Sequence, residues 1–267
     1  MYLNLDGHQV RVNQDLAGGR DLKDYWIEHN GEVHGVHRVP RTVPILLQED
    51  RNELTIRGGI FRNGLSSTRA PYPFWQPITL QLEALPLDTV DLGLEFEYWP
   101  RDSIIVYPLE ENFEGGGGVT FVSNLDLENP TSLQGTTSRA YQGNWSGRVL
   151  FSETSYNFEA LSADFLVLPR RNDNDVYLEI TYQNTTPFTA GLFYTNLNAT
   201  NVQELPIGVG FLSEDKWTTS YLHLQPLIQS VEPGLFKLYL RGSGENAEGE
   251  IQPGNLFIDQ VRIIHFK

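Results

Sequence analysis

Residues 108–118 read P-L-E-E-N-F-E-G-G-G-G, and this stretch decides how the rest of the chain is organised. Each glycine inside a helix or strand destabilises it by about 0.5–1 kcal/mol relative to alanine, because more backbone freedom is lost. Four glycines in succession therefore indicate a turn or a linker. Residues 104–107 (I-I-V-Y) read as a strand before the run, and residues 119–122 (V-T-F-V) as a strand after it. We expect a domain boundary here, with a loop inside one domain as the alternative.

Length and charge limit the classes of protein that fit. The chain has 267 residues, of which 40% are hydrophobic, and this allows one large or two ordinary domains. It carries 19 basic and 34 acidic residues, for a formal net charge of -15. An acidic surface repels phosphate backbones, so we expect no nucleic-acid partner.

Cysteine is absent, which excludes disulfides, thiolate catalysis and cysteine-ligated zinc. The sequence contains no run of about 18 apolar residues, so no transmembrane segment is predicted. The first residues, M-Y-L, have neither the basic start nor the apolar run of a signal peptide. The protein is therefore either cytosolic or exported with a leader that this sequence does not include, and composition does not choose between them.

The first module, residues 1–107, reads as all-β. Its strongest local signal is Asn30-Gly31 between the alternating segments 25–29 and 32–37. Asn-Gly predicts a type I′ hairpin turn, since both turn residues need a positive φ. In that register Trp26 would face Gly35 across the hairpin. Period-two alternation recurs further along the module, so we expect a small fibronectin- or immunoglobulin-like β-sandwich.

Three segments of this module carry a family resemblance. They are Y-W-I-E-H-N-G-E-V-H-G-V (25–36), V-P-I-L (43–46) and G-I-F-R-N-G-L-S-S-T-R-A-P-Y-P-F (59–74). Together they resemble the N-terminal module of uncharacterised surface lipoproteins of the Bacteroidota, over residues 24–114. The resemblance implies export, a lipidated cysteine upstream as membrane anchor, and exposure at the outer-membrane surface. It supplies no activity.

The second module, residues 111–267, has about eight short apolar runs separated by Asn, Asp, Gly and Pro clusters. Even spacing of this kind predicts a larger jelly-roll β-sandwich. The expected strands are residues 147–151, 163–168, 176–182, 190–194, 207–212, 218–224, 235–240 and 256–266.

Three motifs follow one another through this module: N-F-E-G (112–115), A-Y-Q-G-N-W-S-G-R-V (140–149) and N-L-F-I-D-Q-V-R-I (255–263). In this order they resemble carbohydrate-binding modules of the jelly-roll type. The resemblance implies that the first and last strands lie side by side, often with a structural calcium ion there.

The same resemblance makes Glu114 and Asp259 the candidate calcium ligands, with Glu111 and Asp126 able to assist. Calcium takes about 6–8 oxygen ligands, so two carboxylates can anchor a site without proving one. The alternative is that Asp259 caps a loop.

Sugar-binding sheets use aromatic rings as flat platforms, with polar groups around them. The candidate ligand-binding residues are Trp145, Trp217, Tyr182, Tyr194 and Tyr221. Alternation alone does not say which of them face a groove and which face the core. Trp145 and Trp217 lead because loop signals lie beside them.

Catalytic and metal-binding patterns are weak. The G-x-S-x-G elbow of a hydrolase is absent. His29, Glu32 and His34 share a face of the first hairpin, but without a clear third ligand a solvated hairpin tip is favoured over a zinc site.

We therefore expect no enzyme. The leading hypothesis is a non-catalytic surface protein that binds a glycan through its second module. The runner-up is a structural or assembly subunit of an outer-membrane complex, docking an envelope partner through the aromatic-proline segment 70–77. A glycoside hydrolase comes last.

Overall fold

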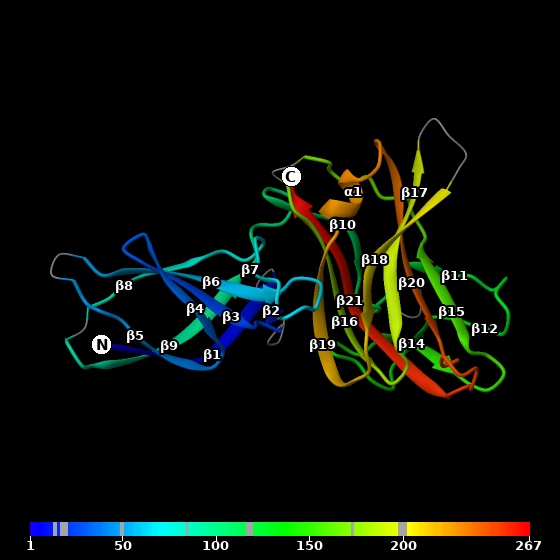
Figure 1. Ribbon diagram of the computed structural model, residues 1–267, viewed down its shortest axis with the longest axis horizontal. Helices are drawn as coiled ribbons and strands as arrows, with labels where there is room; N and C mark the ends of the chain where they lie inside the picture. Colours follow the sequence, from blue (N-terminus) through cyan, green and yellow to red (C-terminus); the bar gives the residue numbers. More distant parts are fainter. Residues whose placement is uncertain are drawn as a thin grey trace. The chain divides into compact units, whose positions relative to one another are not determined.

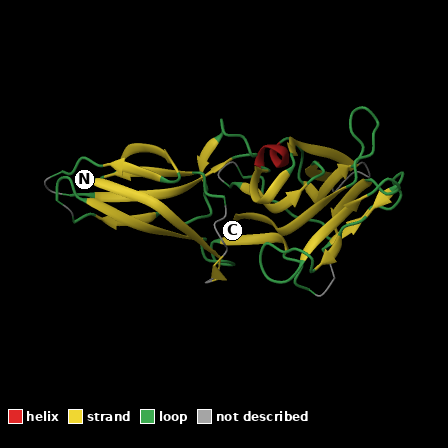
Figure 2. Cartoon of the chain, turned by 90° about the horizontal axis from the view of Figure 1, so that it is seen from below, coloured by secondary structure: helices red, strands yellow, loops and turns green. Residues whose placement is uncertain are grey.

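The computed structural model describes residues 1–12, 15–16, 21–48, 51–83, 85–115, 120–171, 174–196 and 202–267, with backbone only for 6–12 and 15–16. Strands make up nearly all of its regular structure, and one short helix is present (Figures 1 and 2). This confirms the expected all-β class. No helix among the described residues is long and apolar enough to cross a membrane.

The chain divides into two compact units, Met1–Val106 together with Lys267, and Tyr107–Phe266. The change from one to the other falls within strand β10 (Ile105–Glu111). The Glu111 carboxylate at the end of this strand accepts hydrogen bonds from the backbone N–H groups of Phe113, at 2.6 Å, and Thr120. Residues 116–119, which include three of the four glycines and the expected start of a strand, lie outside the described residues.

The first unit contains two sheets. In one, the order is β2-β1-β5, and β9 also pairs with β1; in the other, the order is β4-β3-β6-β7, and β8 also pairs with β6. The strands are β1 (Tyr2–Val12), β2 (Asp15–Leu16), β3 (Asp24–His29), β4 (Glu32–Arg38), β5 (Arg41–Pro44), β6 (Glu53–Phe61), β7 (Arg69–Pro71), β8 (Ile78–Gln81) and β9 (Thr89–Glu97).

The predicted hairpin turn is confirmed, because Asn30 and Gly31 have φ values of 52° and 82°. The register is corrected: Trp26 pairs with Val36, and Gly35 pairs with Ile27, because a bulge between Ile27 and Glu28 shifts the strands. Space for the indole comes instead from Gly59 on β6, where a Cβ atom would lie 2.7 Å from the indole nitrogen.

The aromatic-proline segment 70–77 is part of the core of this unit. Tyr72, Phe74 and Trp75 are all less than 5% exposed. Their rings make edge-to-face contacts, with centroids 5.4 Å apart for Tyr72 and Phe74 and 4.9 Å apart for Tyr72 and Trp75. The proposed docking surface is therefore corrected: these rings stabilise the fold and are not presented to a partner.

The second unit is a sandwich of two sheets. We call them the β20 sheet, with order β11-β15-β20-β17-β18 and β12 on β15, and the β21 sheet, with order β13-β14-β21-β16-β19 and β10 on β21. Its strands are β11 (Phe121–Ser123), β12 (Pro130–Thr131), β13 (Gln134–Thr136), β14 (Ser146–Phe151), β15 (Asn157–Ser162), β16 (Val176–Asn184), β17 (Phe188–Asn196), β18 (Val202–Phe211), β19 (Glu214–His223), β20 (Gly234–Ser243) and β21 (Gly254–Phe266).

The first and last strands of this unit are neighbours, as the resemblance implied, because β10 pairs with β21. The helix α1 (Gln225–Gln229) was not predicted; it is a single turn, and its second residue is Pro226, which the first turn of a helix tolerates.

One buried core holds the two sheets together, since one face of each strand is apolar. Along β20, Phe236, Leu238 and Leu240 are at most 1% exposed and belong to this core. The alternate residues of β20 therefore point away from the core, and they form the surface described next.

Candidate functional site

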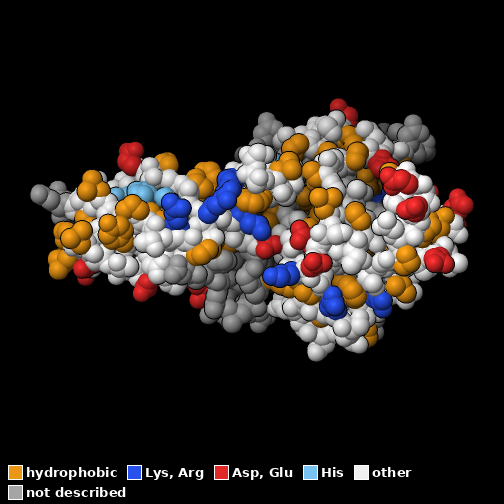
Figure 3. Space-filling model, turned by 60° about the horizontal axis from the view of Figure 1, so that its bottom comes forward, with side chains coloured by type: hydrophobic (Ala, Val, Ile, Leu, Met, Phe, Trp, Pro, Cys, Tyr) orange, Lys and Arg blue, Asp and Glu red, His pale blue; other side chains and the backbone are white. Residues whose placement is uncertain are grey.

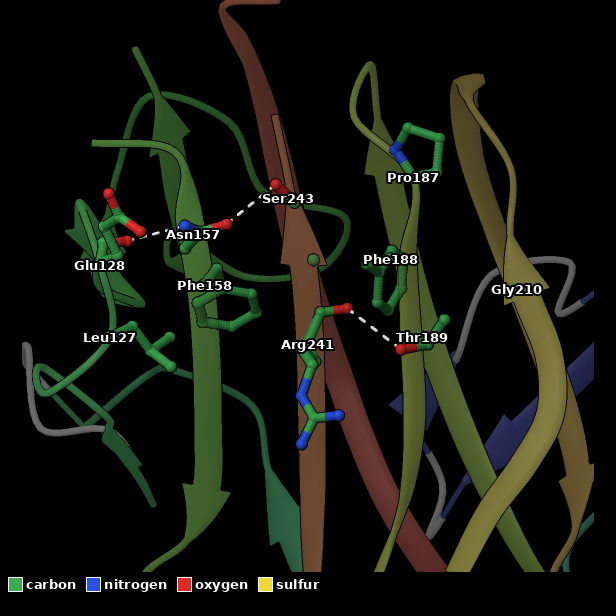
Figure 4. Close-up of a pocket in the computed structure, with 11 residues that line it drawn as sticks. Leu127, Glu128, Asn157, Phe158, Pro187, Phe188, Thr189, Gly210, Arg241 and Ser243 are labelled. Atoms are coloured by element: carbon green, nitrogen blue, oxygen red, sulfur yellow. Dashed lines mark hydrogen bonds between the residues drawn. The ribbon is translucent and has the colours of Figure 1, made fainter. Parts of the chain in front are cut away.

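A groove runs over the outer face of the β20 sheet, with a volume of about 410 Å³ (Figure 4). Residues 241–243 of β20 line its centre, where Figure 4 labels Arg241 and Ser243. Leu127 and Glu128 stand on one side, and Pro187 and Gly210 lie on the other. The walls are mostly apolar, whereas polar groups lie along the floor. Pockets of about 300–1,000 Å³ with apolar walls and a few placed polar groups are typical ligand sites.

The polar groups of the groove are held in place by hydrogen bonds. Ser243 donates to the Asn157 amide oxygen at 2.9 Å, and the Asn157 amide nitrogen donates to the Glu128 carbonyl at 2.7 Å. Thr189 donates to the Arg241 carbonyl at 3.3 Å. The groove is therefore preorganised across β15, β20 and β17, which lowers the entropic cost of binding.

Arg241 connects the groove to a charged cluster on the same face. Its Nε donates to Glu159 at 2.8 Å, and its Nη1 and Nη2 donate to the two carboxylate oxygens of Glu204 at 3.0 and 3.3 Å. Glu159 is 7% exposed, so its charge depends on this partner. The guanidinium group is therefore fixed in one orientation by two carboxylates.

An aromatic layer lies beneath this cluster. The Tyr239 hydroxyl donates to Glu204 at 2.9 Å, and the Arg241 guanidinium lies 4.9 Å from the Tyr239 ring centre. Tyr239 leans across Gly191 of β17, where a Cβ atom would lie 2.4 Å from the ring. Phe193, which is half-buried, packs on the same ring at 4.9 Å. Glycine at position 191 thus allows Tyr239 to reach β18.

The pKa directions agree with this geometry. Burial acts to raise the pKa of Glu204, but hydrogen bonds from Arg241 and Tyr239 outweigh it and lower the pKa below its ordinary value. Burial and the hydrogen bond to Glu204 raise the pKa of the Tyr239 hydroxyl. Glu204 is therefore a carboxylate and Tyr239 a neutral donor at neutral pH.

Three of the predicted platform residues are in the interior. Tyr182 and Tyr194 are 4% and 5% exposed and belong to the core cluster, and Tyr221 is 2% exposed. Tyr182 packs edge-to-face on Phe188, with ring centroids 5.2 Å apart. A buried ring offers no face to a sugar, so the ligand-binding role expected for these tyrosines is corrected.

The two tryptophans lie away from the groove. Trp145 is half-buried against the core cluster, just before β14. Trp217 is half-buried on β19 of the β21 sheet, with its ring centroid 6.0 Å from that of Tyr141. Neither lines the groove on the β20 sheet. The sequence analysis did not identify Tyr239 and Arg241 as residues of the site. The pattern L-Y-L-R at 238–241 could have indicated them, because strand alternation places both on the face opposite to that of the two leucines.

Glu114 and Asp259, the predicted calcium ligands, hold the same loop. Asp259 Oδ2 accepts hydrogen bonds from the backbone N–H groups of Tyr141 and Gln142 at 3.0 and 3.2 Å. Glu114 Oε1 accepts from those of Asn144 and Trp145, both at 2.8 Å. The two carboxylates thus fix residues 141–145, which fits the loop-capping alternative for Asp259.

Asp259 has no exposed surface, and burial raises its pKa to about 6 despite the hydrogen bonds from Gln142, Tyr141 and Gln260. None of its described partners is a cation. A buried carboxylate that is stabilised only by N–H groups would gain from a cation placed nearby.

Other metal candidates are not supported. Among the residues that the structure describes, no group of three His, Asp or Glu side chains could hold a metal ion. His29 is 9% exposed and forms a hydrogen bond with Asn52, whereas His34 forms one with His37 at 3.3 Å. The two histidines of the hairpin therefore have different partners and do not form a common metal site.

Acidic side chains are scattered over the molecular face drawn in Figure 3, among Lys and Arg side chains and hydrophobic side chains.

No family model matches the chain, and no curated protein matches it. One similar solved structure comes from work on the promiscuous specificity of carbohydrate-binding modules from the β-sandwich superfamily. It has 10% identity and a TM-score of 0.46, and the match covers 98% of this chain and 95% of that chain. The CBM22-1 xylan-binding domain of Paenibacillus barcinonensis Xyn10C has 14% identity and a TM-score of 0.42, covering 60% and 94%. The family 11 module of Clostridium thermocellum has 8% identity and a TM-score of 0.38, covering 58% and 94%. Similarity at this level assigns neither a ligand nor a role to this chain.

Proposed function

We propose that residues 107–266 form a non-catalytic carbohydrate-binding unit whose ligand lies in the groove on the β20 sheet. One observation carries the proposal: a groove of about 410 Å³ combines apolar walls at Leu127 and Pro187 with fixed polar groups at Asn157, Ser243 and Arg241. A sugar presents apolar ring faces and hydroxyl groups together, and this lining matches both.

The charges of the groove favour a neutral glycan. Arg241 is already engaged by Glu159 and Glu204, and Glu128 adds a third acidic side chain to the same face. An acidic sugar would meet three carboxylates and a guanidinium group that is already neutralised. Like charges brought together in this way lower affinity, so neutral sugars are preferred.

Two carboxylates on one face also raise the possibility of hydrolysis, but their state argues for binding alone. A glycosidase needs one carboxyl group with a raised pKa to protonate the leaving oxygen. Glu204 has a lowered pKa, and Glu159 is held by Arg241. Glu204 is therefore not poised as an acid, and Glu159 is occupied by its ion pair with Arg241.

The test is calorimetry of the full chain against neutral polysaccharides, including xylan, β-1,4-galactan and mixed-linked β-glucan. Thr189 is exposed and lines the groove, so Thr189→Trp should fill it and reduce affinity by at least tenfold. Thr79→Trp, at an exposed strand position of the first unit, is the matched control and should bind as the wild type does. Equal affinity of the two variants, or no binding by the wild type, contradicts the proposal.

We also propose one structural calcium ion near Glu114 and Asp259, with the remaining oxygens coming from backbone carbonyls and water. What supports it is the buried Asp259 carboxylate with no cationic partner among its described contacts. Calcium should raise the melting temperature of the wild type and leave Asp259→Asn unchanged. An identical melting temperature in calcium and in chelator would contradict it.

The setting we propose is the outer-membrane surface, with attachment by an upstream lipidated cysteine and with a glycan or an envelope protein as partner. It rests on the resemblance of residues 24–114 to Bacteroidota surface lipoproteins. Protease digestion of intact cells that express the native gene tests it: a surface protein is cleaved, and an internal one is protected.

A further inference from the structure

A second pocket, of about 530 Å³, lies on the opposite sheet of the sandwich. Arg148 of β14, Phe257 of β21 and Gln183 of β16 form one cross-strand row there, because Phe257 pairs with both of the others. The remaining lining comes from the loop at 138–139, the turn at 184–185, the start of β19 at 214–215, and Asn255. No residue is shared with the groove on the β20 sheet.

Two arginines meet at the phenyl ring in this pocket. The guanidinium carbons of Arg139 and Arg148 lie 5.2 and 5.5 Å from the Phe257 ring centre, within the range of cation–π contacts. The ring therefore fixes both cations beside one cavity.

Neither arginine has a carboxylate partner among the residues that the structure describes. Arg148 donates from Nε and Nη2 to the amide oxygen of Asn255 at 2.9 and 2.6 Å, and that acceptor is neutral. Arginine has five N–H donors, so three of Arg148 remain for another acceptor. Two arginines without an ion-pair partner at one cavity are a notable feature in a chain of net charge -15.

The lining also limits what the anion can be. Glu214 and Asp215 also line the pocket, and neither comes within 4.0 Å of an arginine nitrogen, so the lining has a basic part and an acidic part that are not ion-paired. A polyanion such as a nucleic acid or a heavily sulfated chain would meet these carboxylates. A ligand with one negative charge and several hydroxyl groups fits both parts, because carboxylates accept hydrogen bonds from hydroxyls.

We propose that this pocket binds a uronic acid residue of a glycan, with its carboxylate on Arg148 and Arg139 and its hydroxyls on the Glu214 and Asp215 side. Arginine suits the task because its planar donors match a carboxylate in two parallel hydrogen bonds. The proposal is independent of the groove on the β20 sheet, since it uses a different sheet and the opposite ligand charge.

The experiment is titration of the full chain with D-glucuronate and D-galacturonate, with glucose and galactose as neutral counterparts, followed by heteronuclear NMR. We expect the uronates to shift the signals of the pocket residues and the neutral sugars to shift them at least tenfold more weakly. Arg148→Met should weaken uronate binding by about 10- to 100-fold, the range of a charged hydrogen bond. Arg139→Met should weaken uronate binding as well. Because residue 139 lies in an exposed loop, this substitution does not alter a strand and should leave folding unchanged.

Arg171→Met is the matched control, because Arg171 is exposed, belongs to the same unit and does not line the pocket. It removes the same charge and should bind uronate as the wild type does. Equal binding of uronate and neutral sugar, an unchanged affinity in both pocket variants, or no uronate binding by the folded wild type would each overturn the proposal. Loss of neutral-glycan binding in Thr189→Trp, with uronate binding retained, separates this site from the groove.

Discussion

The outer faces of the two sheets use arginine in opposite ways. On the β20 sheet, Arg241 forms ion pairs with Glu159 and Glu204, so its charge is already paired within the protein. On the β21 sheet, Arg148 is held by the neutral Asn255, and its charge remains available. The same side chain is thus a structural brace on one face and a candidate ligand-binding group on the other, and the difference lies wholly in its acceptor.

The carboxylates differ in the same way. Glu204 is bound by Arg241 and Tyr239, and its pKa is lowered. Asp259, on the β21 sheet, is bound by backbone N–H groups, and burial raises its pKa to about 6. The hydrogen-bond partners and the burial of each carboxylate therefore determine whether its ionised form stabilises or destabilises the fold.

The strongest test of this contrast is a pair of alanine substitutions. Arg241→Ala leaves Glu159 buried without its cation and should lower the free energy of unfolding by about 3–4 kcal/mol. Arg148→Ala removes a neutral contact and should lower it by less than about 1 kcal/mol. Urea unfolding of the full chain, with hydrogen exchange to assign the transition to residues 107–266, measures both. Adding Glu159→Gln to Arg241→Ala should recover part of the loss, and equal losses in the two single variants would break the comparison.

Stability against pH sharpens the carboxylate contrast. The folded state holds a proton on Asp259 more tightly than the unfolded chain does, so stability falls as pH rises from about 4 to about 6, by about 2–3 kcal/mol. Glu204 acts in the opposite sense: its contribution is present above pH 4.5 and is lost as pH falls through its lowered folded pKa. Because Glu204 is 39% exposed, that contribution should be below about 1 kcal/mol.

Melting temperatures of the wild type, Asp259→Asn and Glu204→Gln between pH 3.5 and 7.5 measure these slopes, all in the presence of a chelator because a calcium ion at Asp259 would keep its carboxylate ionised. The decline between about pH 4 and 6 should be absent in Asp259→Asn and retained in Glu204→Gln. A decline that persists in Asp259→Asn would assign it to other groups.

Much of the fold could be predicted from the sequence because strand alternation and turn residues act locally. The Asn30-Gly31 turn needs no tertiary information, and the runs around 176–182 and 235–240 are strands in the structure. One failure is local: residues 163–168, expected to be a strand, follow the end of β15 at Ser162 and contain only an isolated bridge at Leu166. Another failure is tertiary. A bulge in the β3–β4 hairpin changes the cross-strand partner of Trp26 from Gly35 to Val36, and the alternation of apolar and polar residues does not predict bulges.

The site was harder to predict for the same reason. Along β16 both faces are buried, but Tyr182 shares its face with Leu178 and Ile180, so strand parity could have placed it in the core. Along β20 the outward residues are recognisable from parity, but their meaning depends on Glu159 and Glu204, which come from strands far apart in the sequence. The same holds for Glu114 and Asp259, whose shared loop only the folded chain reveals.

A smaller effect tests the aromatic layer under Arg241. Gly191→Ala places a methyl group against the Tyr239 ring and should cost about 1–2 kcal/mol by overpacking, with displacement of the hydroxyl from Glu204. Gly210→Ala is the matched control on the same sheet, because the nearest atom to its Cβ would be 3.8 Å away. Thermal unfolding compares the two, and an equally small change in both would mean that the ring is free to move.

The smallest expected effect concerns the reactivity of the arginines themselves. The neutral guanidine of arginine attacks the carbonyl carbons of phenylglyoxal, so a raised pKa slows the reaction. Burial acts to lower the pKa of Arg241, but Glu159 and Glu204 outweigh it and raise the pKa. Arg139 is exposed and has no carboxylate partner among the described residues. Peptide mapping should therefore find Arg139 and Arg148 modified several-fold faster than Arg241, and glucuronate should slow the first two only. Equal rates at all three positions would mean that the two faces do not differ in the way their acceptors indicate.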